Sequence, residues 1–351
     1  MKICFILPGF TRTPIGGYKI VYEYANRLST SGNQVSLVFL NNEKMRQFGF
    51  PEFIRLIFVN FFTQIEPRWF LLNKNIKKIS GQSNNFIKKV NNYDVVFATG
   101  IQTVELVKNN FGNAKKIYFI QGYENWGVTE EYLHNTYKYG FTNITVSRWL
   151  KEIVDVYSEK SSYLLKNPID TTIYQRKVNQ KDRTPYTIGL LYHTEKIKGV
   201  RYALAAIYKL KEKYSNLSVE MFGMFPEPKN LPEWIHYKRG ATQKETVNIY
   251  NKVQVFLCAS IEEGYGLTGL EAMACGACLV STSYKGVLEY AENGYNALLS
   301  PVKDIDMLIK HVSELFENQR ERIRLSNNGV ESVKIYSWDE TMNKLNYIIN
   351  K

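Results

Sequence analysis

The sequence predicts an α/β protein with two Rossmann-like domains, each built on a doubly wound parallel sheet. Three observations predict this class. The chain of 351 residues is too long for one ordinary core and suits two domains. Short apolar runs with strand character alternate along it with segments of helical periodicity. Polar or glycine-rich loops follow several of these runs, as expected where the carboxyl ends of parallel strands face a ligand.

The first strand-helix-strand unit opens the chain. Lys2–Leu7 predicts a buried strand, residues 8–17 a loop rich in Gly, Pro and Thr, and residues 34–40 the next strand. The helix between them is predicted by the spacing of Ile20, Tyr24 and Leu28. Gly16 and Gly17 occupy the first strand-to-helix turn, where such sheets bind ligands. A plain turn is the alternative, and the missing Gly-x-Gly-x-x-Gly pattern argues against a dinucleotide site.

Residues 44–92 are the least regular part of the first half. They mix apolar and aromatic residues (Phe53, Ile54, Leu56, Ile57, Phe58, Phe61, Phe62, Trp69, Phe70, Leu71 and Leu72) with basic ones (Arg55, Arg68, Lys74, Lys77, Lys78, Lys88 and Lys89). The mixture predicts either a strand and helix with a solvated basic face or a segment, 53–89, that docks on an anionic membrane surface. No nucleic-acid-binding motif accompanies the charge, so we expect no nucleic-acid partner.

Two more strands are predicted at 94–99 and 116–121, and the second ends in the polar and aromatic sequence Gln-Gly-Tyr-Glu-Asn-Trp. This cluster is a site candidate because the carboxyl ends of parallel strands face the ligand. Gln121 can hydrogen-bond a hydroxyl group but cannot act as a base. Glu124, three residues later, can accept a proton from a hydroxyl group.

The second half repeats the α/β pattern after a predicted polar linker at 175–185. Thr187–Tyr192 predicts a strand, His193 follows it directly, and Lys198-Gly199 precedes a helix. A lysine at the end of such a strand can neutralise negative charge on a ligand without any metal ion. Surface lysines are the alternative, which we favour for Lys196 and not for Lys198.

The most specific stretch is 260–276. The apolar run at 253–259 predicts a buried strand, three glycines follow in a loop, and a helix begins near Thr268. Glycines and a helix N-terminus suit the phosphates of a ligand. Glu263 lies before the loop and Glu271 lies on the first turns of the helix, so the two carboxylates can hold hydroxyl groups at either end of a phosphate-bearing ligand. A nucleotide sugar has this layout.

Glu263 and Glu271, separated by seven residues in the setting EGYGLTGLEAMACG, resemble the signature of the retaining glycosyltransferases of family 4, which have the GT-B fold. The resemblance covers the whole chain and is strongest over 187–300. It implies two Rossmann-like domains that face each other across a cleft. It implies that Glu271 holds the ribose hydroxyls and that Glu263 hydrogen-bonds donor-sugar hydroxyls. It further implies that backbone N–H groups at Gly266, Leu267 and Thr268 bind the diphosphate or the donor sugar.

The resemblance also implies roles elsewhere. Lys198 matches the family's diphosphate-binding lysine, and Gly16 and Gly17 match paired glycines that approach the donor phosphates. The segment 236–240 is similar to one that lines the nucleobase, which places Tyr237, Lys238 and Arg239 at the donor, along with Gly223 at the end of the preceding strand.

This chain departs from the family pattern at two places. Gln121 occupies the place of a histidine that contacts the donor sugar, and His193 occupies the place of an arginine that contacts the diphosphate. A histidine carries a weaker and pH-dependent charge, which puts its share of the diphosphate contact in doubt. The sequence IQGYENW resembles a bacterial subgroup that includes rhamnosyltransferases.

The remaining motifs have structural interpretations. Glu289 is expected at the start of a helix, and Asp304 is expected to cap a helix N-terminus, although Asp304-Ile305-Asp306 superficially resembles a metal-binding motif. Cys275 and Cys278 have redox-motif spacing but fit close packing better, and the four cysteines suit a reducing compartment.

The composition of the chain limits the cellular compartment and the binding partners that we expect. Neither a signal peptide nor a run of about 20 apolar residues is seen, so we expect a cytoplasmic protein associated at most with the inner face of the membrane. The net charge of +12 is uneven. Residues 1–167 hold 21 Lys and Arg against 12 Asp and Glu, whereas residues 168–351 hold 24 against 21. The basic excess of the first half favours an anionic partner there.

These observations and the resemblance together predict a metal-independent, retaining glycosyltransferase acting in bacterial surface polysaccharide synthesis. Residues 1–167 would bind the acceptor, residues 168–335 the nucleotide sugar, and residues 336–351 would form a helix that returns to the first domain. The donor would be a dTDP or UDP sugar carrying rhamnose or another hexose, and the acceptor a glycan, lipid-linked or protein-linked. A sugar-nucleotide epimerase of the same fold and a non-catalytic binding or scaffold protein are the alternatives.

Overall fold

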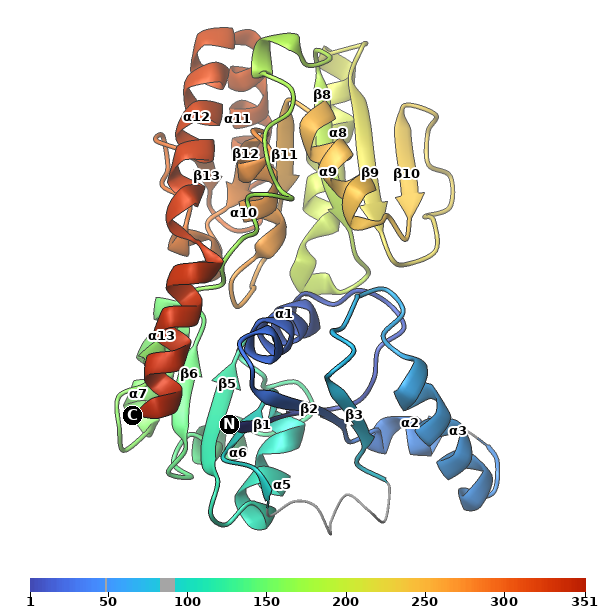
Figure 1. Cartoon of the computed structure of the whole chain (residues 1–351). Coiled ribbons are helices and arrows are strands. Elements are labelled where there is room, and N and C mark those ends of the chain that lie inside the picture. Colours follow the sequence, from blue (N-terminus) through green and yellow to red (C-terminus); the bar gives the residue numbers. More distant parts are fainter. Residues whose placement is uncertain (48, 83–91) are drawn as a thin grey trace. The chain divides into compact units, whose positions relative to one another are not determined.

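The computed structural model describes residues 1–47, 49–82 and 92–351, so Lys88 and Lys89 of the predicted basic segment lie outside the description. The chain divides into two units, shown in Figure 1. Unit 1 comprises Met1–Lys166 together with Met342–Lys351, and unit 2 comprises Asn167–Thr341. None of the helices in the described ranges is long and apolar enough to cross a membrane.

Unit 1 contains a parallel sheet whose described strands lie in the order β3-β2-β1-β4-β5-β6-β7. The strands are β1 (Lys2–Leu7), β2 (Gln34–Phe39), β3 (Lys77–Ser80), β4 (Val95–Ala98), β5 (Lys115–Ile120), β6 (Thr142–Thr145) and β7 (Tyr163–Leu164). The helices are α1 (Gly16–Thr30), α2 (Asn42–Gln47), α3 (Glu52–Ile65), α5 (Ile101–Asn110), α6 (Glu130–Thr136) and α7 (Arg148–Tyr157). The strand order reverses between β1 and β4, which are hydrogen-bonded neighbours. Such a reversal opens a ligand crevice at the carboxyl ends of the strands.

Both faces of this sheet are buried, which explains why its strands are apolar rather than alternating. Cys4 and Ile6 of β1 pack in one core with Val104 of α5. The other face includes Phe119, whose ring lies 5.6 Å from that of Tyr24 on α1. The last helix, α13 (Trp338–Asn350), belongs to this unit from Met342 onward.

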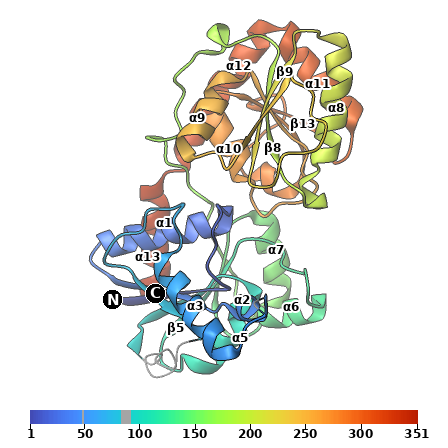
Figure 2. The same ribbon diagram turned by 90° about the vertical axis from the view of Figure 1, so that its right-hand side faces the viewer.

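Unit 2 contains a second parallel sheet, in the order β10-β9-β8-β11-β12-β13. Its strands are β8 (Thr187–Tyr192), β9 (Ser218–Gly223), β10 (Ile235–Arg239), β11 (Val255–Cys258), β12 (Cys278–Thr282) and β13 (Ala297–Ser300). Its helices are α8 (Val200–Lys213), α9 (Gln243–Lys252), α10 (Leu267–Ala274), α11 (Ile305–Glu317) and α12 (Gln319–Ser332). Short 3₁₀ helices occur at Gln180–Asp182, Lys196–Lys198, Lys285–Glu289 and Val333–Ile335. Figure 2 shows α9 and α10 on one side of the strands and α8 and α11 on the other, so this sheet is also doubly wound.

The predicted fold class of two doubly wound parallel sheets is confirmed. The strand order of unit 2 reverses between β8 and β11, which pair in parallel. Asp304 caps α11 as predicted, because its carboxylate accepts a hydrogen bond of 2.9 Å from the backbone N–H of Met307. Cys275 and Cys278 are buried and not disulfide-bonded, as the packing interpretation requires, and burial raises the pKa of both thiols to about 12.

Two local predictions were wrong. Glu289 ends the 3₁₀ helix Lys285–Glu289 instead of starting a helix. Residues 175–185 are not a simple polar linker, because Gln180 and Arg183 are buried. Arg183 donates to the carbonyl oxygens of Tyr250, Val253 and Cys275 at 2.8, 2.5 and 2.6 Å. A single buried guanidinium thus satisfies backbone carbonyls at the ends of two helices, which hydropathy alone cannot reveal.

Candidate donor site

The predicted site residues lie at the carboxyl ends of strands, but in two separate units. Unit 2 carries His193, Lys198, Gly223, Tyr237, Lys238, Arg239, Glu263, Gly266, Leu267, Thr268 and Glu271. Unit 1 carries Gly16, Gly17, Gln121 and Glu124.

Lys198 and Glu263 form the centre of the group in unit 2. Lys198 Nζ lies 3.2 Å from Glu263 Oε2, and both side chains are largely shielded from solvent, with exposures of 25% and 13%. Lys198 follows β8 and Glu263 follows β11, so the pair lies at the reversal of the strand order. This is the edge where α/β sheets bind ligands.

Backbone geometry fixes the two loops that carry this pair. The N–H of Ile261 donates to the carbonyl oxygen of Ile197 at 2.7 Å and so joins the loop after β11 to the 3₁₀ turn after β8. Gly199 has a φ of +61°, and a Cβ placed there would lie 1.7 Å from the carbonyl oxygen of Ala259. Only glycine fits a left-handed conformation against neighbouring backbone, which explains why Lys198 is followed by glycine.

The Glu263 carboxylate is held at both oxygens. Ser260 Oγ donates to Glu263 Oε1 at 2.6 Å, while Lys198 occupies the other oxygen. Ser260 is itself buried, and its carbonyl oxygen accepts a hydrogen bond from the hydroxyl of Thr282. Ser260 lies within the signature stretch, but the sequence analysis assigned it no role. Its position three residues before Glu263 was the one signal that the two side chains could meet.

His193 is beside this centre but is not a second cation. Its Nδ1 accepts a hydrogen bond of 3.1 Å from the N–H of Glu195, and its ring packs edge-on against Phe225 at 4.7 Å. Burial lowers the pKa of His193 below its ordinary value of 6.5; the charge of Glu195 opposes this shift in part, and the charge of Lys198 adds to it. The imidazole is therefore mostly neutral at pH 7, so Lys198 supplies the positive charge here.

The loop glycines start α10 in a defined geometry. Gly266 is the N-cap of α10, with a φ of +90°, and a Cβ there would lie 2.0 Å from the hydroxyl oxygen of Tyr284. Tyr290 donates from its hydroxyl to the carbonyl oxygen of Gly266 at 2.6 Å, and the two tyrosine hydroxyls lie 3.2 Å apart. The amides of Leu267 and Thr268 lie in the first turn of α10, where N–H groups lack intrahelical acceptors. Such groups can bind an anion.

Glu271 lies on α10 with only 8% of its surface exposed. Its Oε2 accepts a hydrogen bond of 3.2 Å from the hydroxyl of Tyr250 on α9. The tyrosine ring packs against Phe256 and Phe222 on the sheet, which holds its hydroxyl beside the carboxylate. Tyr250 was not identified from the sequence, because an apolar helix face with one tyrosine is typical of a core.

The residues predicted to line the nucleobase contact the loop after β9. Tyr237 donates from its hydroxyl to the carbonyl oxygen of Phe225 at 2.6 Å, and Arg239 Nε donates to that of Met224 at 3.3 Å. Lys238 pairs with Glu245 at 2.8 Å. A Cβ on Gly223 would lie 2.4 Å from the carbonyl oxygen of Tyr192, so this glycine is required for packing between β8 and β9. The structure shows these packing contacts, and the donor role of the four residues stays a prediction.

In unit 1 the structure brings Gly17 and Gln121 together. A Cβ on Gly17 would lie 3.3 Å from Gln121 Nε2, so the amide side chain rests against the first turn of α1. Gly16 is the first residue of the same helix. The glutamine amide and the backbone of the first turn of α1 form a polar surface at the carboxyl ends of β1 and β5.

Glu124 is buried against the start of α5. Its Oε2 accepts a hydrogen bond from the N–H of Ile101, and the residue is 8% exposed. Burial raises the pKa of Glu124 to about 7, although the bond from Ile101 opposes the shift. The carboxylate therefore has a capping role in the fold, and its predicted role as a proton acceptor stays a prediction.

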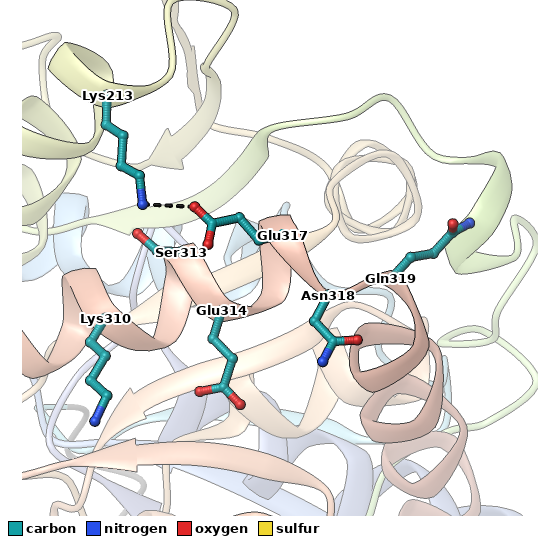
Figure 3. A pocket seen from close by; sticks show the side chains of 7 residues that line it. All are labelled: Lys213, Lys310, Ser313, Glu314, Glu317, Asn318 and Gln319. Carbon is teal, nitrogen blue, oxygen red and sulfur yellow. Dashed lines mark ion pairs between the residues drawn. The ribbon is translucent and has the colours of Figure 1, made fainter.

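Unit 2 also has a surface hollow away from these residues. It has a volume of about 690 Å³ and is lined by Lys213, Lys310, Ser313, Glu314, Glu317, Asn318 and Gln319. Figure 3 shows the ion pair between Lys213 and Glu317, whose atoms lie 2.7 Å apart. None of the predicted donor residues lines this hollow, and its lysines and glutamates are typical of a solvated surface. Among the described residues, no cluster of three or more His, Cys, Asp or Glu side chains is placed to hold a metal ion.

Comparisons with known proteins show what this chain is similar to. Residues 172–332 match the family model of the glycosyl transferases group 1. An uncharacterized glycosyltransferase of Methanocaldococcus jannaschii is 27% identical over 221 residues, which cover 58% of this chain and 59% of that protein. The MMP alpha-(1->4)-mannosyltransferase of Mycolicibacterium hassiacum is 25% identical over 226 residues, which cover 57% of this chain and 54% of that protein. The chain thus spans little more than half the length of these relatives.

Solved structures extend the likeness to the whole fold. HepE of Anabaena, in complex with UDP and glucose, superposes with a TM-score of 0.77 at 13% identity, covering 100% of this chain and 99% of that one. Sucrose-phosphate synthase from Thermosynechococcus elongatus gives a TM-score of 0.77 at 13% identity, covering 99% and 98%. These neighbours are GT-B glycosyltransferases, so the predicted GT-B fold is confirmed. Within it, residues 172–332, which carry Lys198, Glu263 and Glu271, are the part of the chain that is similar to the glycosyl transferases group 1.

Proposed function

We propose that this chain is a glycosyltransferase that moves a sugar from a nucleoside-diphosphate sugar to an acceptor hydroxyl group. The observation that carries the proposal is the Lys198–Glu263 pair at the strand reversal of a group 1 domain, directly before the N-terminus of α10. A cation and free helix amides suit a diphosphate, and a carboxylate suits sugar hydroxyls. The similar proteins of M. jannaschii and M. hassiacum are themselves a glycosyltransferase and a mannosyltransferase by name.

Each group in unit 2 has one proposed task. Glu271 holds the ribose hydroxyls, and the amides of Gly266, Leu267 and Thr268 bind the diphosphate or the donor sugar. Lys198 stabilises the charge on the departing nucleoside diphosphate, with a minor contribution from the largely neutral His193.

The proposed reaction retains the anomeric configuration and needs no metal ion. The bond between the anomeric carbon and the diphosphate oxygen breaks, and its electron pair leaves with the diphosphate. The acceptor oxygen bonds to the same face of that carbon, and its proton passes to the departing diphosphate. Glu263 hydrogen-bonds the donor sugar throughout, and exclusion of water from the site would limit hydrolysis of the donor.

For the substrates we propose a UDP or dTDP donor carrying rhamnose or another hexose. The acceptor would be a glycan, lipid-linked or protein-linked, of a bacterial surface polysaccharide pathway. The acceptor would bind unit 1. We further propose a cytoplasmic enzyme that contacts the membrane peripherally.

The test measures the Tm of the protein with a panel of nucleoside diphosphates and nucleotide sugars. UDP, dTDP, GDP and ADP are tested first. A rise in Tm with one base and its sugar conjugates is expected, because a ligand that binds only the folded state stabilises it. Product analysis with and without a glycan acceptor follows. Donor consumption without acceptor would favour an epimerase, and donor binding without turnover on any acceptor would favour a scaffold protein.

A further inference from the structure

Helix α3 (Glu52–Ile65) turns its large apolar residues away from the core of unit 1. Phe53, Ile57 and Phe61 are 65%, 64% and 58% exposed, whereas the helix buries only Val59 and Thr63. Residues four apart lie on one helix face, so the three exposed side chains form a continuous stripe. An ordinary surface helix has the reverse pattern, with its apolar stripe on the core.

Aromatic contacts widen this stripe into a patch. Phe50 and Phe58 are 53% and 42% exposed, and their rings stack at 5.9 Å. The ring of Phe58 also stacks on Phe62 at 6.5 Å. The α3 apolar face is defined here as Phe50, Phe53, Ile57, Phe58 and Phe61. Contiguous exposed apolar residues of this kind mark interaction sites.

Hydrogen bonds from the buried side of α3 and from its C-terminal end fix the helix to neighbouring elements, so the apolar face cannot simply rotate inward. Asn41 Nδ2 donates to the hydroxyl of Thr63 at 3.0 Å, and Gln64 Nε2 donates to the carbonyl oxygen of Lys78 on β3 at 3.0 Å. Lys78 Nζ in turn donates to the carbonyl oxygen of Glu66 at 2.9 Å. Figure 1 shows α3 beside β3, the edge strand of the described sheet of unit 1.

Cations border the α3 apolar face. The guanidinium of Arg12 lies 4.4 Å from the centre of the Phe62 ring, and Lys44 Nζ lies 5.7 Å from that of Phe10, which is itself near Phe62. Arg55 binds the carbonyl oxygen of Met45 at 2.6 Å and so joins α2 to α3. Residues 42–80 contain seven Lys and Arg against three Asp and Glu.

We propose that the α3 apolar face inserts into the headgroup region of an anionic lipid bilayer. Aromatic side chains with a basic rim are suited to this environment, because the rings enter the interface while the cations meet lipid phosphates. A second copy of the chain fits less well, because it would bring the same basic rims together. The proposal deepens the proposed function, since it names the surface that would bring the enzyme to a lipid-linked acceptor.

The experiment measures binding of the full chain to vesicles, without donor or acceptor. Wild type is expected to sediment with phosphatidylglycerol-containing vesicles and to bind pure phosphatidylcholine vesicles at least tenfold more weakly. The double variant Phe53→Ser/Phe61→Ser is expected to lose at least tenfold in affinity for the anionic vesicles. Val156→Ser, at a 74% exposed apolar position on α7, is the matched control and is expected to bind like wild type. Circular dichroism checks that each variant is folded.

Three results would overturn the proposal. Wild type that binds no vesicles is the first, and a double variant that binds as tightly as wild type is the second. The third is a wild-type dimer in vesicle-free solution that the double variant abolishes, which would assign the face to a second copy. Because no sugar is transferred in this assay, its outcome is independent of whether the chain is a glycosyltransferase.

Discussion

Lys198 and Glu263 approach to 3.2 Å from loops that follow two different strands of the same sheet. Their contact depends on the hydrogen bond from the backbone N–H of Ile261 to the carbonyl oxygen of Ile197. It also depends on the absence of a side chain at Gly199. Ser260 holds the other carboxylate oxygen, so Glu263 is oriented before any ligand arrives. A charged pair fixed in this way is suited to a ligand with an anionic group beside neutral hydroxyls.

The first prediction concerns the charge of Lys198. Lys198→Met is expected to weaken nucleoside-diphosphate binding about tenfold to a hundredfold, because a hydrogen bond to a charged group contributes about 1.5–3 kcal/mol. Isothermal titration calorimetry with the diphosphate selected by the thermal-shift panel measures the effect. Lys196→Met is the control, since Lys196 is exposed two residues away. Equal affinities of Lys198→Met and wild type would remove Lys198 from the site.

The second prediction separates the ribose from the phosphates. Glu271→Gln is expected to weaken nucleoside-diphosphate binding by about tenfold or more, because a neutral amide accepts hydroxyl hydrogen bonds less strongly than a carboxylate. Binding of inorganic pyrophosphate, which has no ribose, is expected to stay within about twofold of wild type. If both ligands lose affinity equally, Glu271 supports the site as a whole instead of binding ribose. Tyr250→Phe tests how much of the effect comes from the hydroxyl that holds Glu271.

The third prediction concerns the tyrosines that fix the start of α10. Tyr290→Phe removes the hydrogen bond to the Gly266 carbonyl oxygen and is expected to lower the free energy of unfolding by about 1 kcal/mol. Gly266→Ala is expected to cost more, because φ is +90° and the added Cβ would meet the Tyr284 hydroxyl. Urea unfolding measures both. Tyr295→Phe, at a 46% exposed position, serves as the control, and a Tyr290→Phe variant as stable as this control would contradict the assignment.

The fourth prediction is a pH dependence that originates at Glu124. Its folded pKa of about 7 lies above the ordinary value of 4.5, so the protonated form favours the folded state. The stabilisation is fully present below pH 4.5 and is lost as pH rises through about 7, a change of about 3 kcal/mol by linkage. Glu124→Gln keeps an oxygen for the Ile101 N–H but cannot titrate.

The measurement for Glu124 is the free energy of unfolding of both proteins between pH 4.5 and 8. Subtracting the free energy of unfolding of Glu124→Gln from that of wild type removes the contribution of His193. The lowered pKa of His193 acts in the opposite sense, because it destabilises the fold as pH falls. The difference is expected to decline steadily up to about pH 7 and then level off. A flat difference would show that the carboxyl titrates normally.

Much of this fold is predictable from the sequence because both sheets are covered by helices on two faces. Strands such as β1 and β8 then become short apolar runs beside polar or glycine-rich loops, and residues 2–7 and 187–192 were predicted with these bounds. Residues 175–185 could not be predicted, because the burial of Arg183 depends on carbonyl oxygens more than 60 residues away in sequence.

The positions of some candidate site residues could be predicted from local spacing, whereas their roles toward a donor stay predictions. Lys198 and Glu263 each lie beside a glycine turn after an apolar run, and the structure pairs them at the reversal of the strand order, while Glu271 lies on α10. Tyr250 and Tyr290 were not predicted, because the hydroxyl of each forms a hydrogen bond to a residue that is distant in sequence, Glu271 and Gly266 respectively. The sequence left membrane docking of 53–89 open, but it could not show that α3 turns this face outward, since helical periodicity does not say which face the core will cover.

The measurement that tests the central claim most directly is sugar-transfer turnover by Glu263→Ala. With the donor selected by the thermal-shift panel, kcat is expected to fall at least about a hundredfold, as for loss of an electrostatic group at a reacting centre. Affinity for the nucleoside diphosphate is expected to stay within about threefold of wild type, and Glu262→Ala, which changes the exposed neighbouring carboxylate, is expected to turn over like wild type. Turnover by Glu263→Ala at the wild-type rate would contradict the account.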